Sequence, residues 1–123
     1  MKKILVIDDA LQIRELLKTV LELEDYDVTT TTDGDEGVEA FRKNPADLII
    51  TDMIMPTKEG LEIIQELVEE YKNIKIIAMS GGGNIGSDSY LKAAELFGAS
   101  KTLQKPFDID ELKEAVKELI GGP

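Results

Sequence analysis

Short runs of apolar residues recur along the chain at intervals that suit buried strands. Residues 4–7, 48–51 and 74–79 are dominated by aliphatic side chains, which is typical of strands covered on both faces of a sheet. Residues 28–31 are rich in threonine, and residues 101–104 include lysine, threonine and glutamine. The pattern therefore predicts five strands, of which the second and the fifth are the more polar.

Each predicted strand is followed by a segment in which apolar residues recur every three or four positions, as on one face of a helix. In the first such segment these positions are Ile13, Leu16, Leu17, Val20 and Leu21. Asp33, with Glu36 three residues later, resembles a capping pair that begins a short helix through Phe41. The remaining helices are predicted over 61–71, over 90–97 and after a cap formed by Asp108 and Glu111.

Strict alternation of strands and helices predicts a parallel sheet with right-handed crossovers and helices on both faces. The most apolar strands belong in the middle of such a sheet, and the polar ones suit its exposed edges. This predicts a doubly wound α/β fold with strand order 2-1-3-4-5, a flavodoxin-like (βα)5 three-layer sandwich. We expect residues 1–123 to form one domain that ends in a frayed Gly121-Gly122-Pro123.

The amino-acid composition excludes several kinds of partner and reactive group. Acidic residues outnumber basic ones 25 to 14, and the net charge of −11 argues against nucleic acid or an anionic membrane as a partner. The chain has no cysteine and no histidine, which excludes disulfides, thiolate zinc sites and imidazole bases. No apolar stretch is long enough for a signal peptide or a membrane span, so we expect a soluble cytoplasmic protein.

Reactive side chains follow four of the predicted strands. Ligands of open α/β sheets bind beyond the carboxyl ends of the strands. The residues expected there are Asp8, Asp9, Asp52, Ser80 and Lys105. Taken singly, each has an ordinary explanation: Asp9 as a helix cap, Asp52 as a turn cap, Ser80 as loop filler and Lys105 as a surface charge. Their coincidence at one edge of the sheet favours a common site.

A cluster of three carboxylates needs counter-charges, because two unit charges 4 Å apart repel by roughly 4 kcal/mol at an effective dielectric of 20. Lys105 supplies one positive charge. A hard divalent cation, Mg²⁺ above all, is the natural second, since every candidate ligand atom is an oxygen. A carboxylate beside Mg²⁺ can also act as a nucleophile toward phosphorus without a separate base.

These residues, in this order, resemble the signature of the receiver domain of two-component response regulators. The matching motifs are Asp8-Asp9, Asp52 within Thr51-Asp52-Met53-Ile54-Met55-Pro56, Ser80-Gly81 and Lys105-Pro106-Phe107. The resemblance spans essentially the whole chain. It implies a signalling switch whose phosphoacceptor is Asp52, with a histidine kinase or a histidine phosphotransfer protein as phosphodonor.

The resemblance also implies a ligand set. Mg²⁺, or Mn²⁺ in its place, would be bound by Asp9, Asp52 and the backbone carbonyl of Ile54, with Asp8 assisting through water. Ser80, Gly81 and Lys105 would engage the phosphoryl group, and the Lys105–Pro106 peptide bond would be cis.

Two features depart from the family pattern. Thr102 stands three residues before Lys105, where receivers commonly carry an aromatic switch residue. The segment from Ser80 to Lys105 is also a few residues longer than usual, with the excess in the glycine-rich stretch 81–86. We hypothesise that residues 81–86 carry the response to phosphorylation in place of an aromatic rotamer. Hydrogen exchange with and without a phosphoryl mimic would test this.

Three other functions compete with the receiver. Residues 81–86 satisfy the dinucleotide-binding pattern G-x-G-x-x-G, but they follow the fourth strand, and Lys105 stands where an acidic ribose ligand is expected. An aspartate-nucleophile phosphatase would need a second acid at position 54, where the chain has Ile54. A phosphorylation-independent interaction module is favoured by Thr102 and disfavoured by the complete set of acids and Lys105.

Overall fold

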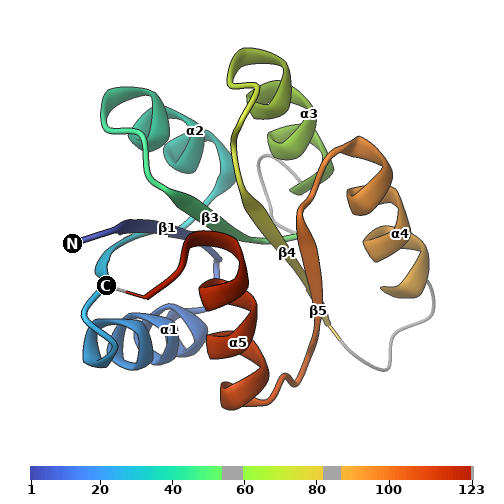
Figure 1. The fold of residues 1–123 in the computed structure, drawn as a ribbon. Helices are drawn as coiled ribbons and strands as arrows, with labels where there is room; N and C mark the ends of the chain where they lie inside the picture. Colours follow the sequence, from blue (N-terminus) through green and yellow to red (C-terminus); the bar gives the residue numbers. More distant parts are fainter. Residues whose placement is uncertain (54–59, 82–86, 123) are drawn as a thin grey trace.

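The computed structural model describes residues 1–53, 60–81 and 87–122 of the chain. In these residues strands and helices alternate as the sequence predicts (Figure 1). The elements are β1 (Lys3–Ile7), α1 (Leu11–Leu23), β2 (Asp27–Thr31), α2 (Gly34–Lys43), β3 (Leu48–Asp52), α3 (Gly60–Glu70), β4 (Ile76–Gly81), α4 (Ser87–Phe97), β5 (Lys101–Lys105) and α5 (Ile109–Ile120).

The five strands form one parallel sheet in the order β2-β1-β3-β4-β5, which confirms the predicted topology. Every residue of β3 is buried, whereas the edge strands β2 and β5 each include exposed and partly exposed positions. The apolar runs therefore lie where helices cover both faces, and the threonine-rich and lysine-containing strands lie where solvent reaches the sheet.

Two apolar layers hold the sheet between its helices. Helices α1 and α5 cover one face, and α2, α3 and α4 cover the other (Figure 1). Alternate side chains of β1 enter different layers: Ile4 and Val6 pack with α1 and α5, while Leu5 and Ile7 pack against the opposite helices. The strand thus contributes to both cores at once, as its unbroken apolar sequence requires.

The fourth strand is shifted from its predicted position. It was expected over 74–79 but begins at Ile76 and ends at Gly81, so Ser80 lies inside the strand rather than after it. The backbone N–H of Ile74 donates to the carbonyl of Tyr71 (3.3 Å), which closes the turn after α3. Hydrophobicity alone cannot separate this turn from the strand, because Ile74 also packs against the core.

The predicted caps of α2 and α5 are both present, but some of their hydrogen bonds go to residues other than those expected. The Asp33 side chain accepts a hydrogen bond from the Glu36 backbone N–H (2.9 Å), and the Glu36 carboxylate accepts one from the Thr32 N–H (3.2 Å). Asp108 caps α5 by accepting from the Asp110 N–H (2.8 Å) rather than through Glu111. Helix α4 starts at residue 87, three residues earlier than its apolar pattern predicts.

The expected fraying of Gly121 is wrong, because the end of α5 is bound to the amino edge of the sheet. The hydroxyl of Tyr26 donates to the Gly121 carbonyl (2.6 Å), and Lys75 Nζ donates to the Leu119 carbonyl (2.5 Å). Lys2 Nζ donates to the carbonyl of Ile120. These donors satisfy helix carbonyls that have no partner within the helix. Burial, with the nearby Glu24 carboxylate, raises the pKa of Tyr26.

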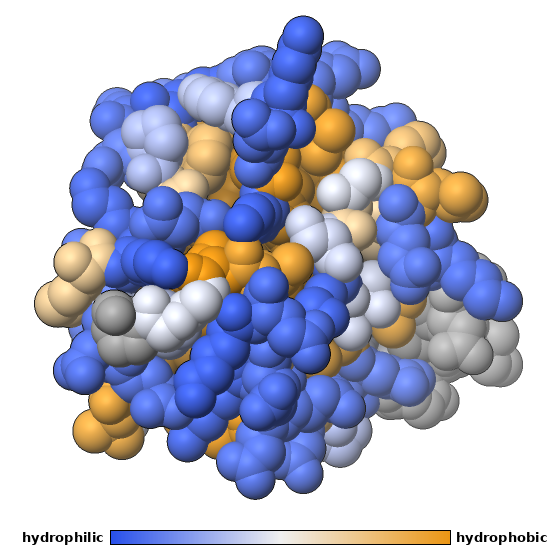
Figure 2. Space-filling view, viewed as in Figure 1, coloured by the Kyte–Doolittle hydropathy of each residue, from blue (hydrophilic) through white to orange (hydrophobic). Residues whose placement is uncertain are grey.

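The face shown in Figure 2 is mostly hydrophilic. Hydrophobic side chains gather near its middle and at the upper right over α4, the helix that carries the exposed Leu96 and Phe97. Within the described residues, every helix is too short or too polar to cross a membrane.

Gly60 begins α3 directly against the end of β3, and its replacement should disturb both. A Cβ at this position would lie 2.7 Å from the Asp52 carbonyl oxygen and 2.7 Å from the Met53 Cα. Because both atoms belong to the backbone, Gly60→Ala should lower the free energy of unfolding by about 1–3 kcal/mol, measured by urea denaturation followed by circular dichroism. Gly122→Ala is the control, since its Cβ would meet nothing within 4 Å. Equal stability of the two variants would contradict this prediction.

Candidate functional site

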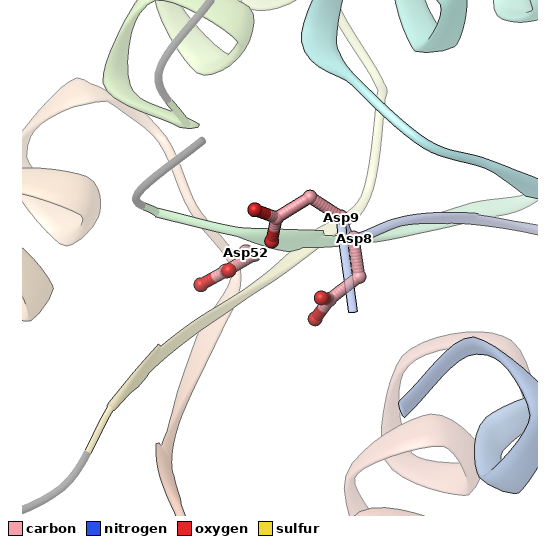
Figure 3. A group of neighbouring side chains, drawn as sticks. All are labelled: Asp8, Asp9 and Asp52. Atoms are coloured by element: carbon pink, nitrogen blue, oxygen red, sulfur yellow. The ribbon is translucent and has the colours of Figure 1, made fainter. Parts of the chain in front are cut away.

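Three carboxylates meet at the carboxyl edge of the sheet. In the parallel register Ile7 lies beside Thr51, so β1 delivers Asp8 and Asp9 at the level where β3 ends with Asp52. One carboxylate oxygen from each aspartate lies within 4.8 Å of the others (Figure 3). The adjacency predicted from the sequence is therefore present in the structure.

Lys105 reaches this cluster from the edge strand β5. Its Nζ lies 2.9 Å from Asp8 Oδ2 and 3.6 Å from Asp52 Oδ2. Strand β4 separates β5 from β3, so only a long side chain can bridge the distance. The Lys105–Pro106 peptide bond is cis. Lys105 is thus an internal counter-charge of the site, and its interpretation as a surface charge is wrong.

Asp8 and Asp9 are neighbours in sequence but occupy different environments. Asp8 is fully buried: its Oδ1 accepts from the Ala10 N–H (2.9 Å), and its Oδ2 pairs with Lys105. Asp9 is exposed, and the N-cap of α1 is Ala10, without a side-chain capping bond. Asp9 is therefore not a helix cap. The Asp52 side chain is 11% exposed, so a small ligand can reach it together with Asp9.

Of the other predicted site residues, some lie within the described part of the chain and some lie outside it. Ser80 is buried on β4, and Gly81 lies beside Lys105 in the register of β4 and β5. The carbonyl of Ile54 and residues 82–86 lie outside the described residues.

Thr102 lies on β5, away from the acids. Its hydroxyl donates to Glu95 Oε1 (3.5 Å), and it lines a hollow of about 790 Å³ between α4, β5 and α5. This hollow is separate from the cluster of aspartates, because its lining includes none of them.

Sequence reasoning missed one residue at the site, Arg14. Its guanidinium donates from Nη1 to the backbone carbonyl of Asp8 (2.8 Å). Arg14 stands one turn into α1 and belongs to none of the motifs. The helical spacing from Ala10, whose carbonyl accepts from the Arg14 N–H, is the one signal that places it near the end of β1.

The arrangement suits a hard cation and a phosphoryl group. Among the described residues, three carboxylates meet the one ammonium of Lys105 at this edge. Oxygen ligands without nitrogen or sulfur favour Mg²⁺ over transition metals. The residues present therefore fit a magnesium site, and the ammonium of Lys105 is within reach of an oxyanion formed at Asp52.

Comparison with known proteins assigns the class. Residues 4–117 match the family described as the response regulator receiver domain. The chain belongs to this family, the receiver domains of two-component systems, and its strand order and helices are those of the family's flavodoxin-like fold.

Individual relatives cover nearly the whole chain. Sporulation initiation phosphotransferase F of Bacillus subtilis is 35% identical over 119 residues, which are 97% of this chain and 94% of the relative. Response regulator ArlR of Staphylococcus saprophyticus is 35% identical over 121 residues, but this chain spans only 53% of its length.

A solved structure of a response regulator is also similar to this chain over nearly its whole length. The response regulator TrrA of Thermotoga maritima, in complex with Mg²⁺ and BeF, is 40% identical with a TM-score of 0.84, and the match covers 98% of this chain and 100% of that one.

Proposed function

We propose that this chain is a phosphorylation-activated switch that accepts a phosphoryl group on Asp52 from a histidine kinase or a histidine phosphotransfer protein. The observation that carries the proposal is the position of Asp52. Its side chain is 11% exposed, one of its carboxylate oxygens lies within 4.8 Å of an oxygen of each of the two other acids, and its Oδ2 is 3.6 Å from Lys105 Nζ. Residues 1–123 would form the receiver domain that undergoes this phosphorylation.

In the proposed reaction a carboxylate oxygen of Asp52 attacks the phosphorus of a phosphohistidine. The new O–P bond forms as the N–P bond breaks, and the donor imidazole leaves with the electron pair. Asp9, Asp52 and the Ile54 carbonyl would hold Mg²⁺, which supplies positive charge for the phosphoryl oxygens. Lys105 and Ser80 would bind those oxygens after transfer, and Asp8 would keep Lys105 in place.

Acetyl phosphate distinguishes the proposed switch from its rivals. The protein is incubated with acetyl phosphate and Mg²⁺, and its intact mass and the released phosphate are recorded. A phosphoprotein that persists for minutes and is acid-labile supports the receiver. Steady release of phosphate would indicate a phosphatase, and an unchanged mass would indicate a phosphorylation-independent interaction module.

Asp9 should be required for Mg²⁺ binding, because it is the exposed carboxylate of the cluster. Asp9→Asn is expected to weaken Mg²⁺ binding at least about tenfold, since it removes a charged ligand while keeping the shape of the side chain. Mg²⁺ should also raise the melting temperature of the wild type more than that of the variant. Isothermal titration and thermal melts measure both effects.

Glu69→Gln provides the matched control for Asp9→Asn. It removes the same charge from an exposed position on α3, outside the cluster. Its Mg²⁺ affinity should equal that of the wild type. If Asp9→Asn left the titration unchanged, the cation would have to bind elsewhere.

A further inference from the structure

The peptide that joins Asp8 to Asp9 is held from several sides. Asp8 is the first residue after β1, and its N–H donates to the Thr31 carbonyl (3.2 Å). Its side chain is fixed by the Ala10 N–H and by Lys105. Its carbonyl, which belongs to the peptide leading to Asp9, accepts the hydrogen bond from Arg14.

We propose that Arg14 is a positioning residue for Asp9, an inference that rests on the proposed Mg²⁺-dependent function. Asp9 is exposed, so packing around its side chain contributes little to its direction. The direction of its Cα–Cβ bond instead depends on the orientation of the peptide between Asp8 and Asp9. Arg14 fixes the carbonyl end of that peptide from the first turn of α1.

Positioning by Arg14 and the positive charge of Arg14 should affect Mg²⁺ affinity in opposite directions. A guanidinium beside a cluster of carboxylates repels a cation, so its removal for electrostatic reasons alone would tighten Mg²⁺ binding. Without the hydrogen bond from Arg14, the peptide between Asp8 and Asp9 can change its orientation. The carboxylate of Asp9 must then be ordered when Mg²⁺ binds, which lowers the Mg²⁺ affinity. If positioning dominates, removing Arg14 weakens Mg²⁺ binding although a positive charge has been lost.

Lys18 provides a matched control on the same helix. Its Nζ also donates to a backbone carbonyl, that of Val28 (3.2 Å), and pairs with Glu22 (3.1 Å). Lys18→Met and Arg14→Met therefore each remove one positive charge and one bond to a main-chain carbonyl. Only Arg14→Met removes a bond to the peptide that carries the acids.

The experiment compares Mg²⁺ affinities of the wild type, Arg14→Met, Arg14→Lys and Lys18→Met by isothermal titration, with amide NMR shifts of Asp9 recorded in the same titrations. We expect Arg14→Met to bind Mg²⁺ roughly tenfold more weakly, Arg14→Lys to recover part of the loss, and Lys18→Met to match the wild type. Phosphorylation of Arg14→Met by acetyl phosphate should be slow at low Mg²⁺ and normal at saturating Mg²⁺.

Equal or tighter Mg²⁺ binding by Arg14→Met would overturn the positioning role while leaving the proposed function intact. So would an equal loss in Lys18→Met. Failure of the wild type itself to bind Mg²⁺ would overturn the proposed function and this inference together. Should Arg14→Met fail to fold, Arg14→Lys decides the matter, because its shorter reach to the Asp8 carbonyl must then weaken Mg²⁺ binding measurably.

Discussion

Asp52→Asn is expected to abolish acid-labile phosphorylation by acetyl phosphate, with no increase in mass above background. The amide that replaces the carboxylate is a poor nucleophile, and the nearby carboxylate of Asp8 is buried and already paired with Lys105. The fold should survive, because the substitution is isosteric and removes a negative charge from a cluster that has an excess of them. Intact mass after incubation, together with a melting curve, measures both effects.

Asp27→Asn is the control for the Asp52 experiment. Asp27 is an exposed acid at the start of β2, at the opposite edge of the sheet, so this variant should be phosphorylated like the wild type. Full labelling of Asp52→Asn at another residue would refute the assignment of the phosphoacceptor. A variant that melts far below the wild type would instead show that Asp52 is needed for the fold.

Of the substitutions proposed, Lys105→Met should lower the free energy of unfolding the most in the absence of Mg²⁺. Asp8 is fully buried and would lose its ion pair with Lys105, while Asp52 would lose the ammonium that lies 3.6 Å from its Oδ2. Breaking a buried pair by removing one partner typically costs 3–5 kcal/mol. Because the Lys105 side chain is 18% exposed, we expect a loss of about 2–4 kcal/mol.

Millimolar Mg²⁺ should restore part of this loss, because a bound cation replaces the missing charge only in the folded state. Urea denaturation with EDTA and with Mg²⁺ measures the difference. Lys101→Met is the control on the same strand. Its pair with Glu118 is partly exposed and should be worth at most about 1 kcal/mol, without rescue by Mg²⁺. Equal losses in the two variants, or no effect of Mg²⁺ on Lys105→Met, would show that Lys105 is not the counter-charge of the acids.

Hydrophobic patterning determined the order of elements and the strand order, because a strand covered on both faces is mostly apolar, as 48–50 is throughout. It also determined which residues share the carboxyl edge, since parallel strands end together. Hydrophobic patterning did not determine the first and last residues of each element. Ile74 is apolar in either setting, so only the hydrogen bond to Tyr71 shows that it belongs to the turn and that Ser80 lies within the strand.

Tertiary structure alone decided how each site residue is placed. Asp8 and Asp9 are identical in type and adjacent, yet one is buried against Lys105 and the other is exposed, because successive side chains after a strand point in different directions. Lys105 reaches across β4, a distance that no spacing in the sequence encodes. Arg14 joins the site through one bond to a main-chain carbonyl, a kind of contact that any long donor side chain can make and that leaves no motif behind.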